Sequence, residues 1–483
     1  MRSADPAPAD SRVHPETAPA EPIPSAAWWV LAAVGMGTFM SALDSSVVNV
    51  ALPIMGVNLG VSVARIEWVV TVYLLVVSGT LLGFGRLGDL RGHKRAYIAG
   101  FAIFVSASIL CGTARDANVL IAFRALQALG AAMLFSNSPA IITMAFPPTH
   151  RGRALGLQAT LTYLGLTLGP PLGGFLTRAL GWPAIFFINV PVGLAGVLVS
   201  WRVLPDDRGT AARGERFDFP GAGLFFGGLI GVLFALNQGH VWGWGSGRTL
   251  ALLGTSILTL ATFVVWERRS RAPMLDLSLF ESRTFSACSL AALLNYVGIY
   301  AIVFIMPFYL IQGRGLPAEQ AGLMLAVQSV VMAVTSPLAG ALSDRIGSRR
   351  LTVSGMLVLT GALIGLSITG STTPLAAVAT LLGLAGLGTG LFVSPNNSAL
   401  LGAAPRARLG IASGVLAEAR NVGMVLGVGL AGAVFTTLLA GLQPGPNEAF
   451  FAAVRASLLA AGGVTVLAAL VSLAAGQPQA GSR

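Results

Sequence analysis

The stretch GRLGDLRGHKR, at positions 85–95, returns as GALSDRIGSRR at positions 340–350. The two copies share glycine at the first and eighth positions, leucine at the third, aspartate at the fifth and arginine at the last. Each copy is a short charged break between two long apolar runs, and the second begins 255 residues after the first. A duplicated half is therefore predicted, with the same turn used twice. The aligned pairs are Gly85 and Gly340, Asp89 and Asp344, and Arg95 and Arg350.

The composition around these stretches is typical of a membrane protein. Of 483 residues, 54% are apolar and only 10% are charged, and the mean hydropathy is +0.77. A soluble chain carries about 25% charged residues. The 60 glycines and 26 prolines would indicate loops or disorder unless the helices lie in lipid. The expected fold class is an all-α polytopic membrane protein.

Apolar runs of about 20 residues, the length that crosses a bilayer, predict fourteen transmembrane helices. A six-helix half needs fewer residues than the offset between the two copies, so an insertion is expected between the halves. The predicted helices are 26–53, 66–86, 95–113, 117–145, 152–179, 184–204, 219–238, 249–267, 285–311, 319–342, 351–370, 374–400, 410–440 and 450–475. The predicted domains are a disordered tail at 1–25, a first half at 26–204, an insertion with two helices at 205–283, a second half at 284–475 and a tail at 476–483.

The basic residues predict the orientation of these helices. Most of the 30 Lys and Arg residues fall in alternate connections, on the same side as the amino-terminal tail. Cytoplasmic loops collect such residues, so both termini are expected on the cytoplasmic side of the cell (inner) membrane. The eight tryptophans fall at predicted helix ends, as an interfacial aromatic belt requires.

Other classes of protein are disfavoured. The net charge of +11 is dispersed among apolar runs, so nucleic acid is not an expected partner. Cys111 and Cys288 lie far apart, and the four histidines have no ligand spacing, so no disulfide, metal or other cofactor is expected. The only lysine, Lys94, lacks the setting of a phosphate loop. No catalytic Ser/His/Asp set or carboxylate pair appears on one helix face, so no enzyme is predicted.

The two copies resemble the loop signature of the major facilitator superfamily, Gly-x-Leu-x-Asp-Arg-x-Gly-x-basic-basic. The second copy is complete, and the first has Leu90 in place of arginine. The sequence LDSSVVNVALP, at 43–53, is similar to the first-helix motif of the fourteen-helix drug:proton antiporter branch. RALQALGAA, at 124–132, resembles its fourth-helix motif, with Ala128 where glycine is usual. GLTLGPPLGG, at 165–174, is similar to the exporter signature of the fifth helix.

The resemblance covers residues 26–475 and implies two pseudo-symmetric six-helix halves plus two inserted helices. It implies a proton-coupled exporter of drugs or other hydrophobic small molecules that works by alternating access. The expected partners are a small-molecule substrate, protons and the lipid bilayer, and the chain is expected to act as a monomer. Two alternatives stay open: a proton-coupled importer of a metabolite, and a non-transporting sensor on the same scaffold. The sequence does not identify the substrate.

Two acids, Asp44 and Glu418, fall deep inside predicted helices. Desolvation favours the protonated form of a carboxylate, which suits a group that binds and releases protons. Arg124 also lies inside a helix and needs a carboxylate or backbone partner; the resemblance implies a role in proton relay. The alternatives are that hydroxyls such as Ser41 satisfy Asp44 and that Glu418 belongs to a structural charge pair. A direct bridge from Glu418 to Arg420 is not assumed, because residues two apart do not face each other on a helix.

The remaining candidates are polar residues at mid-helix and small residues at helix contacts. Glycines four apart at Gly165, Gly169 and Gly173 share a helix face, and Pro170 weakens the hydrogen-bond ladder, which suits a gating helix but also ordinary close packing. A polar residue at mid-helix can equally bond a neighbouring helix. The candidate substrate contacts are Asp44, Asn137, Tyr163, Asn295, Tyr296, Gln328, Asn396 and Glu418. The candidate gating residues are Gly85, Asp89, Arg95, Gly165, Gly169, Pro170, Gly173, Gly174, Gly340, Asp344 and Arg350.

Overall fold

A computed structural model describes residues 23–147, 150–207, 218–270, 277–405, 409–441 and 446–474. Over these residues the chain is helical apart from short connections. The predicted tails at 1–25 and 476–483 lie outside this description, except for residues 23–25, where the first helix begins.

The first part of the chain forms the helices of one half. They are α1 (Ser25–Asn58), α2 (Val63–Ile66), α3 (Trp68–Arg91), α4 (His93–Thr113), α5 (Ala117–Ala145), α6 (Arg151–Leu180), α7 (Ala184–Phe187) and α8 (Asn189–Val203). Two further helices, α9 (Phe219–Trp242) and α10 (Gly247–Arg269), form a hairpin. The second half holds η1 (Leu277–Glu281), α11 (Arg283–Phe308), η2 (Tyr309–Gly313), α12 (Ala318–Ile346), α13 (Ser348–Ser367), α14 (Leu375–Gly402), α15 (Leu409–Gly441) and α16 (Pro446–Ala474).

Thirteen helices of the described chain are long and apolar enough to cross a membrane. The fourteenth long helix, α6, is not among them, because glycine, threonine, glutamine and arginine dilute its apolar residues. It nevertheless packs extensively on α1 within the bundle. The predicted helix ranges agree with these fourteen elements to within a few residues at most ends.

The duplication is visible in matching glycine contacts. Gly100 of α4 and Gly130 of α5 each face the other's backbone so closely that a Cβ atom would meet it within about 3 Å. Gly355 of α13 and Gly388 of α14 form the same contact. Gly355 lies 255 residues after Gly100, the offset of the two charged loops. The same glycine contact therefore occurs once in each half, as expected of pseudo-symmetric halves.

A second matching contact relates α6 to α15. Gly165 and Gly169 of α6 lie against the α1 backbone, and Gly423 and Gly427 of α15 lie against the α11 backbone. Both glycines of α15 follow their counterparts by 258 residues. The helix pair α1 and α6 thus corresponds to the pair α11 and α15.

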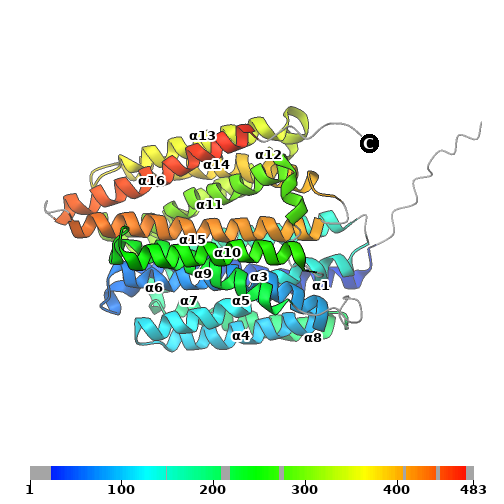
Figure 1. The fold of residues 1–483 in the computed structure, drawn as a ribbon. Coiled ribbons are helices and arrows are strands. Elements are labelled where there is room, and N and C mark those ends of the chain that lie inside the picture. The colour runs from blue at the N-terminus through cyan, green and yellow to red at the C-terminus, as the bar shows by residue number, and fades with distance from the viewer. Residues whose placement is uncertain are drawn as a thin grey trace, which may run out of the picture.

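The halves meet where α6 packs on α12. A Cβ atom on Gly174 would strike the backbone of Ala318 and Glu319, and one on Gly322 would strike the backbone of Pro170. Arg178 and Glu319 form an ion pair of 2.5 Å beside this contact. In Figure 1 the green hairpin of α9 and α10 lies between orange α15 and the blue helices of the first half, and α9 contacts both α15 and α3.

Candidate functional site

Asp44 of α1 lies at the centre of a sealed polar cluster in the first half. Its side chain is 0% exposed. Nη1 of Arg124 donates to its Oδ2 at 2.6 Å, and the side-chain amides of Gln127 and Asn189 donate to its Oδ1 at 2.9 and 2.7 Å. The carboxylate therefore has three donors from α5 and α8. The alternative that hydroxyls donate to Asp44 is wrong, because its donors are a guanidinium and two amides. Oγ of Ser41 has no partner among the described residues.

Arg124, like its partner Asp44, makes several further contacts. Its Nε donates to the carbonyl of Val69 at 3.1 Å, and its Nη1 also donates to Oε1 of Gln127 at 2.6 Å. The guanidinium lies 4.1 Å from the ring centre of Tyr73, within the range of a cation–π contact. Buried charges are normally paired and hydrogen-bonded in this way. We call Asp44, Ser108, Arg124, Gln127 and Asn189 the Asp44 cluster; Ser108 joins it through Nε2 of Gln127, at 2.8 Å.

A second polar group lies between the halves. Tyr163 of α6 and Tyr296 of α11 lie beside each other, and the charge of Arg420 on α15 acts on both phenols and on Tyr300. Both carboxylate oxygens of Glu418 and Nε of Arg420 are buried with no hydrogen-bond partner in the described part of the chain. We call Tyr163, Tyr296, Tyr300, Glu418 and Arg420 the central cluster.

Unpartnered charged groups distinguish the central cluster from the Asp44 cluster, in which the amide Oδ1 of Asn189 is the only buried side-chain atom without a partner among the described residues. Buried polar groups in proteins are normally bonded, so each exception requires an explanation, such as a ligand or solvent that completes it. Glu418 can accept hydrogen bonds or a cation, Arg420 can donate to an acceptor, and the three phenols offer aromatic faces and hydroxyls. An aromatic small molecule with polar substituents would match this set of groups.

The two clusters are adjacent. Tyr73 stacks on Arg124, its hydroxyl reaches the carbonyl of Ser41 at 3.5 Å, and it interacts electrostatically with both Asp44 and Tyr300. Tyr300 also lies beside the hydroxyl of Ser45, the neighbour of Asp44 in α1. A change in the Asp44 cluster can therefore reach the central cluster through Tyr73 or through α1.

Other predicted substrate contacts lie at helix–helix contacts. Nδ2 of Asn396 donates to the carbonyl of Cys288 at 3.1 Å, and Nδ2 of Asn295 lies 3.8 Å from the sulfur of Met356. Gln328 of α12 is buried, and its backbone lies against Gly386 of α14. The structure favours the packing alternative for Asn396, whereas Oδ1 of Asn295 is buried with no hydrogen-bond partner among the described residues. The role of these three residues as substrate contacts stays a prediction, as does that of Tyr163, Tyr296 and Glu418 in the central cluster.

Asn137, also predicted to contact substrate, belongs instead to the first charged loop. Its Oδ1 lies 2.8 Å from Nδ1 of His93, and its side chain packs on Gly88. On the other side of the ring, Nε2 of His93 lies 3.3 Å from Oδ1 of Asp89. Asp89 therefore contacts residues of its own half, and Arg95 is exposed nearby in the first turn of α4.

Two acids that the sequence reasoning missed hold this loop. The carboxylate of Asp207 accepts from the backbone N–H groups of His93 and Lys94 at 2.6 and 3.2 Å, and so caps α4 from a distant segment. Nζ of Lys94 pairs with Asp206 at 2.8 Å, and this pair lowers the pKa of the exposed Asp206 carboxyl. The signal in the sequence was an acidic pair directly after a helix in an otherwise basic connection.

The second charged loop has the same backbone, and no side chain among the described residues caps α13. Gly347 begins α13 with φ +87°, as Gly92 begins α4 with φ +99°, a conformation that favours glycine. Arg350 lies, with Arg349, on a cavity of about 790 Å³ beside the start of α13, and Gly340 packs on Ser394 of α14. The side chain of Asp344 lies outside the described residues.

The proposed gating helix α6 packs closely on α1. Gly165, Gly169 and Gly173 all face the α1 backbone, so the predicted shared face exists and is used for packing. Pro170 cannot donate to the carbonyl of Leu166. The hydroxyl of Ser46 donates to that carbonyl instead, at 2.9 Å. The proline therefore replaces an internal bond of α6 with a bond to α1.

Two acids that the apolar pattern of the sequence did not single out are also buried. Glu67 is 0% exposed and lies against Gly432 of α15, and Glu267 is 3% exposed near the end of α10. Both lie at helix ends, where the sequence pattern predicts contact with water. Only the packing of neighbouring helices reveals their burial.

Comparisons with known proteins agree with this architecture. The Major Facilitator Superfamily profile matches residues 34–428 and 288–482. The Riboflavin transporter RibZ of Clostridioides difficile is 34% identical over 85% of this chain and 89% of its own length. The Multidrug resistance protein Stp of Mycobacterium tuberculosis is 34% identical over 86% and 77%. The Tetracenomycin C resistance and export protein of Streptomyces glaucescens is 30% identical over 88% and 79%.

A solved structure has the same fold. It is a bacterial homolog to the human lysosomal transporter Spinster, in an inward-facing and unoccupied conformation. It is 18% identical in sequence, with a TM-score of 0.66, and the alignment covers 93% of this chain and 97% of that one.

Proposed function

This chain belongs to the Major Facilitator Superfamily, in its drug-efflux branch, and from that premise we propose that it is a proton-coupled exporter of aromatic, largely hydrophobic small molecules. The observation that carries the proposal is the contact of two clusters. One is a sealed carboxylate and arginine pair, and the other contains buried charges without partners. We assign proton coupling to the first and substrate binding to the second.

The coupling follows from the charge of Asp44. A proton on this carboxyl removes the ionic part of its bond to Arg124 and the acceptor that orients Gln127 and Asn189. The freed guanidinium remains charged and must find other acceptors. Because Tyr73 lies against both Arg124 and the central cluster, this rearrangement changes the surface that substrate contacts.

The gating follows from α6. It is bonded to α1 through Ser46 and pressed on α12 at Gly174, so it joins the Asp44 helix to the opposite half. Rocking of one half against the other would break the α12 contact while the α1 contact is kept. The charged loops would then brace the other end of each half.

The transport assay uses inside-out membrane vesicles, a proton gradient and ethidium, a fluorescent aromatic cation. Wild-type protein is expected to accumulate ethidium only while the gradient is present. Asp44→Asn is expected to fall to the level of vesicles without the protein, because it cannot exchange the proton. Asp116→Asn is the matched control, since Asp116 caps α5 at the surface and asparagine caps equally well. Unchanged gradient-driven transport by Asp44→Asn would refute the coupling role.

A second candidate function is transport of a metabolite, which the similarity to a riboflavin transporter favours. Riboflavin is itself a planar aromatic compound, so the central cluster does not exclude it. Uptake of riboflavin by whole cells of an auxotroph would support this candidate, and ethidium efflux without such uptake would support the exporter. Absence of both processes with the wild-type protein, together with an Asp44→Asn variant of unchanged phenotype, would favour the non-transporting sensor.

We also propose that the protein lies in the plasma (inner) membrane with both termini in the cytoplasm. We further propose that it acts as a monomer, without bound nucleic acid or cofactor and without enzymatic activity. The concentration of arginine on alternate connections supports the orientation. Labelling of single cysteines placed at Arg91 and Arg115 with an impermeant maleimide tests it. Labelling of the Arg91 position in intact cells would show that the orientation is the opposite of the one proposed.

A further inference from the structure

The inserted hairpin leaves an apolar groove against the second half. The groove has a volume of about 520 Å³, within the range of cavities that hold one small ligand. Its walls come from α3, α9, α11, α15 and α16, together with the connection between α9 and α10. It is separate from both polar clusters, since none of their residues lines it.

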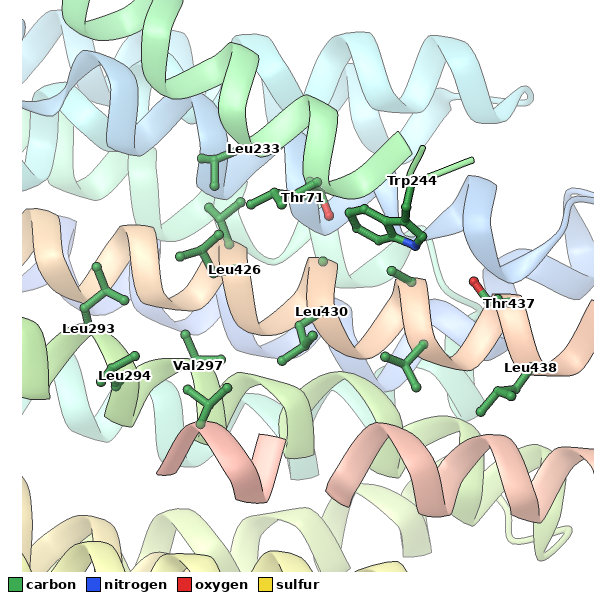
Figure 2. Close-up of a pocket in the computed structure, with 16 residues that line it drawn as sticks. Thr71, Leu233, Trp244, Leu293, Leu294, Val297, Leu426, Leu430, Thr437 and Leu438 are labelled. Carbon is green, nitrogen blue, oxygen red and sulfur yellow. The ribbon is translucent and has the colours of Figure 1, made fainter. Parts of the chain in front are cut away.

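The chemistry of the groove changes along its length. Figure 2 shows Leu293 and Leu294 at one end and Trp244 and Thr437 at the other. From Val425 to Leu438 the groove follows α15 for about 20 Å, at about 1.5 Å per residue. That length is comparable to one leaflet of a bilayer, about 15 Å of hydrocarbon.

The end at the connection between α9 and α10 supplies polar atoms. The hydroxyl of Thr71 is buried with no hydrogen-bond partner among the described residues, and its side chain is 1% exposed. Figure 2 shows this hydroxyl on the groove, on the side toward Trp244. Tryptophan is typical of the level of lipid headgroups. The groove is therefore apolar where it runs toward the membrane centre and polar where it reaches the interface.

We propose that this groove binds one acyl chain of a membrane phospholipid, with its ester group at Thr71 and Trp244 and its tail toward Leu293. The lining helices α9, α11, α15 and α16 are apolar spans, so hydrocarbon is the medium in which the groove lies. A phospholipid also matches the gradient from polar to apolar, because it carries acceptors at one end of a long apolar chain. The bound chain completes the packing of the α9–α10 hairpin on the second half.

The site can be filled by a single substitution. Gly429 lies on the groove, and a Cβ atom there would have no neighbour within 4 Å. Gly429→Leu therefore places a side chain in the space of the acyl chain, at a position where the added Cβ atom meets no neighbour. Gly361→Leu is the matched control, because Gly361 of α13 has the same free space but lies exposed and away from the groove.

The experiment counts phospholipids that remain bound after detergent exchange, by native mass spectrometry of the whole protein. Wild type and Gly361→Leu are expected to keep one phospholipid that Gly429→Leu has lost. Gly429→Ala is expected to keep it partly, and Thr71→Val, which fills nothing, is expected to release it at a lower detergent concentration.

Equal retention by wild type, Gly429→Leu and Thr71→Val would overturn the proposal. So would displacement of the bound phospholipid by ethidium, since the groove would then be a site for transported compounds. Neither result depends on proton coupling at Asp44, so this proposal and the proposed function can fail separately.

Discussion

At the scale of single residues, the buried ion pair is the feature with the largest energetic consequence. Arg124 and Asp44 are 1% and 0% exposed, and each makes further hydrogen bonds. Removing one member of a buried pair leaves an uncompensated charge and costs about 3–5 kcal/mol. Replacing both members removes that penalty.

Arg124→Gln is therefore expected to destabilise the protein by about 3–5 kcal/mol, and addition of Asp44→Asn is expected to recover most of this loss. Proton-driven transport should stay absent in the double variant, because no titratable carboxyl remains at this place. Thermal or denaturant unfolding in detergent measures the stability, and the vesicle assay measures transport. A double variant no more stable than Arg124→Gln would show that the pair does not set the stability here.

At the scale of elements, helix α6 depends on α1 for one of its own hydrogen bonds. Pro170 leaves the carbonyl of Leu166 without its usual donor, and the hydroxyl of Ser46 takes that place. Three glycines bring the two backbones close enough for the bond to form. A sequence motif that suggests flexibility by itself is here part of a rigid helix pair.

Ser46→Ala is expected to lower stability by about 1 kcal/mol or somewhat more, because a buried carbonyl loses its donor. Ser41→Ala is the matched control on the same helix, since its hydroxyl has no partner among the described residues and its loss should be nearly neutral. The free energies of unfolding of the two variants in the same detergent make the comparison. If both lose equally, the bond to Leu166 contributes nothing specific.

At the scale of the whole molecule, the two halves have the same framework and different chemistry. The carbonyls of Phe39 and Leu293, which face Gly165 and Gly423, are 254 residues apart, and this offset aligns Asp44 with Gly298. The 258-residue offset between Gly130 and Gly388 aligns Arg124 with Leu382. The Asp44 cluster therefore has apolar counterparts in the second half, which instead supplies Glu418 and Arg420 to the interface. The halves are held together by α6 and α12, and that contact must open if the halves rock.

A covalent bridge across this contact is expected to stop transport. Arg178→Cys with Glu319→Cys places two exposed thiols on opposite halves, at the position of an ion pair. A short bis-maleimide that joins them should reduce ethidium transport by about tenfold or more, because alternating access requires the halves to separate. The control is the pair Arg65→Cys and Asn118→Cys, whose parent side chains bond within the first half. Equal transport by both bridged proteins would exclude rocking at this contact.

The sequence by itself determined the membrane class, the long helices, the duplication and the family. Hydropathy, glycine spacing and repeated turns are local properties, and a bilayer gives apolar segments of about 20 residues almost no other fold. It also identified Asp44, Arg124 and Glu418 as unusual, since charge inside an apolar run is visible along the chain. It placed Tyr163 and Tyr296 among the candidate substrate contacts without showing that they meet.

Only the tertiary structure decided which of these groups are partners. Asp44 is bonded to residues 80, 83 and 145 positions away, and the charge of Arg420 acts on tyrosines from both halves. Asn137, Asn295 and Asn396 carry polarity equal to that of the cluster residues, yet they bond neighbouring helices. The burial of Glu67 was likewise invisible in the sequence, and the acidic pair at 206–207 was visible without the helix that Asp207 caps. The physical reason is that burial and hydrogen bonding depend on which helix faces meet, and helix rotation and packing are set by long-range contacts.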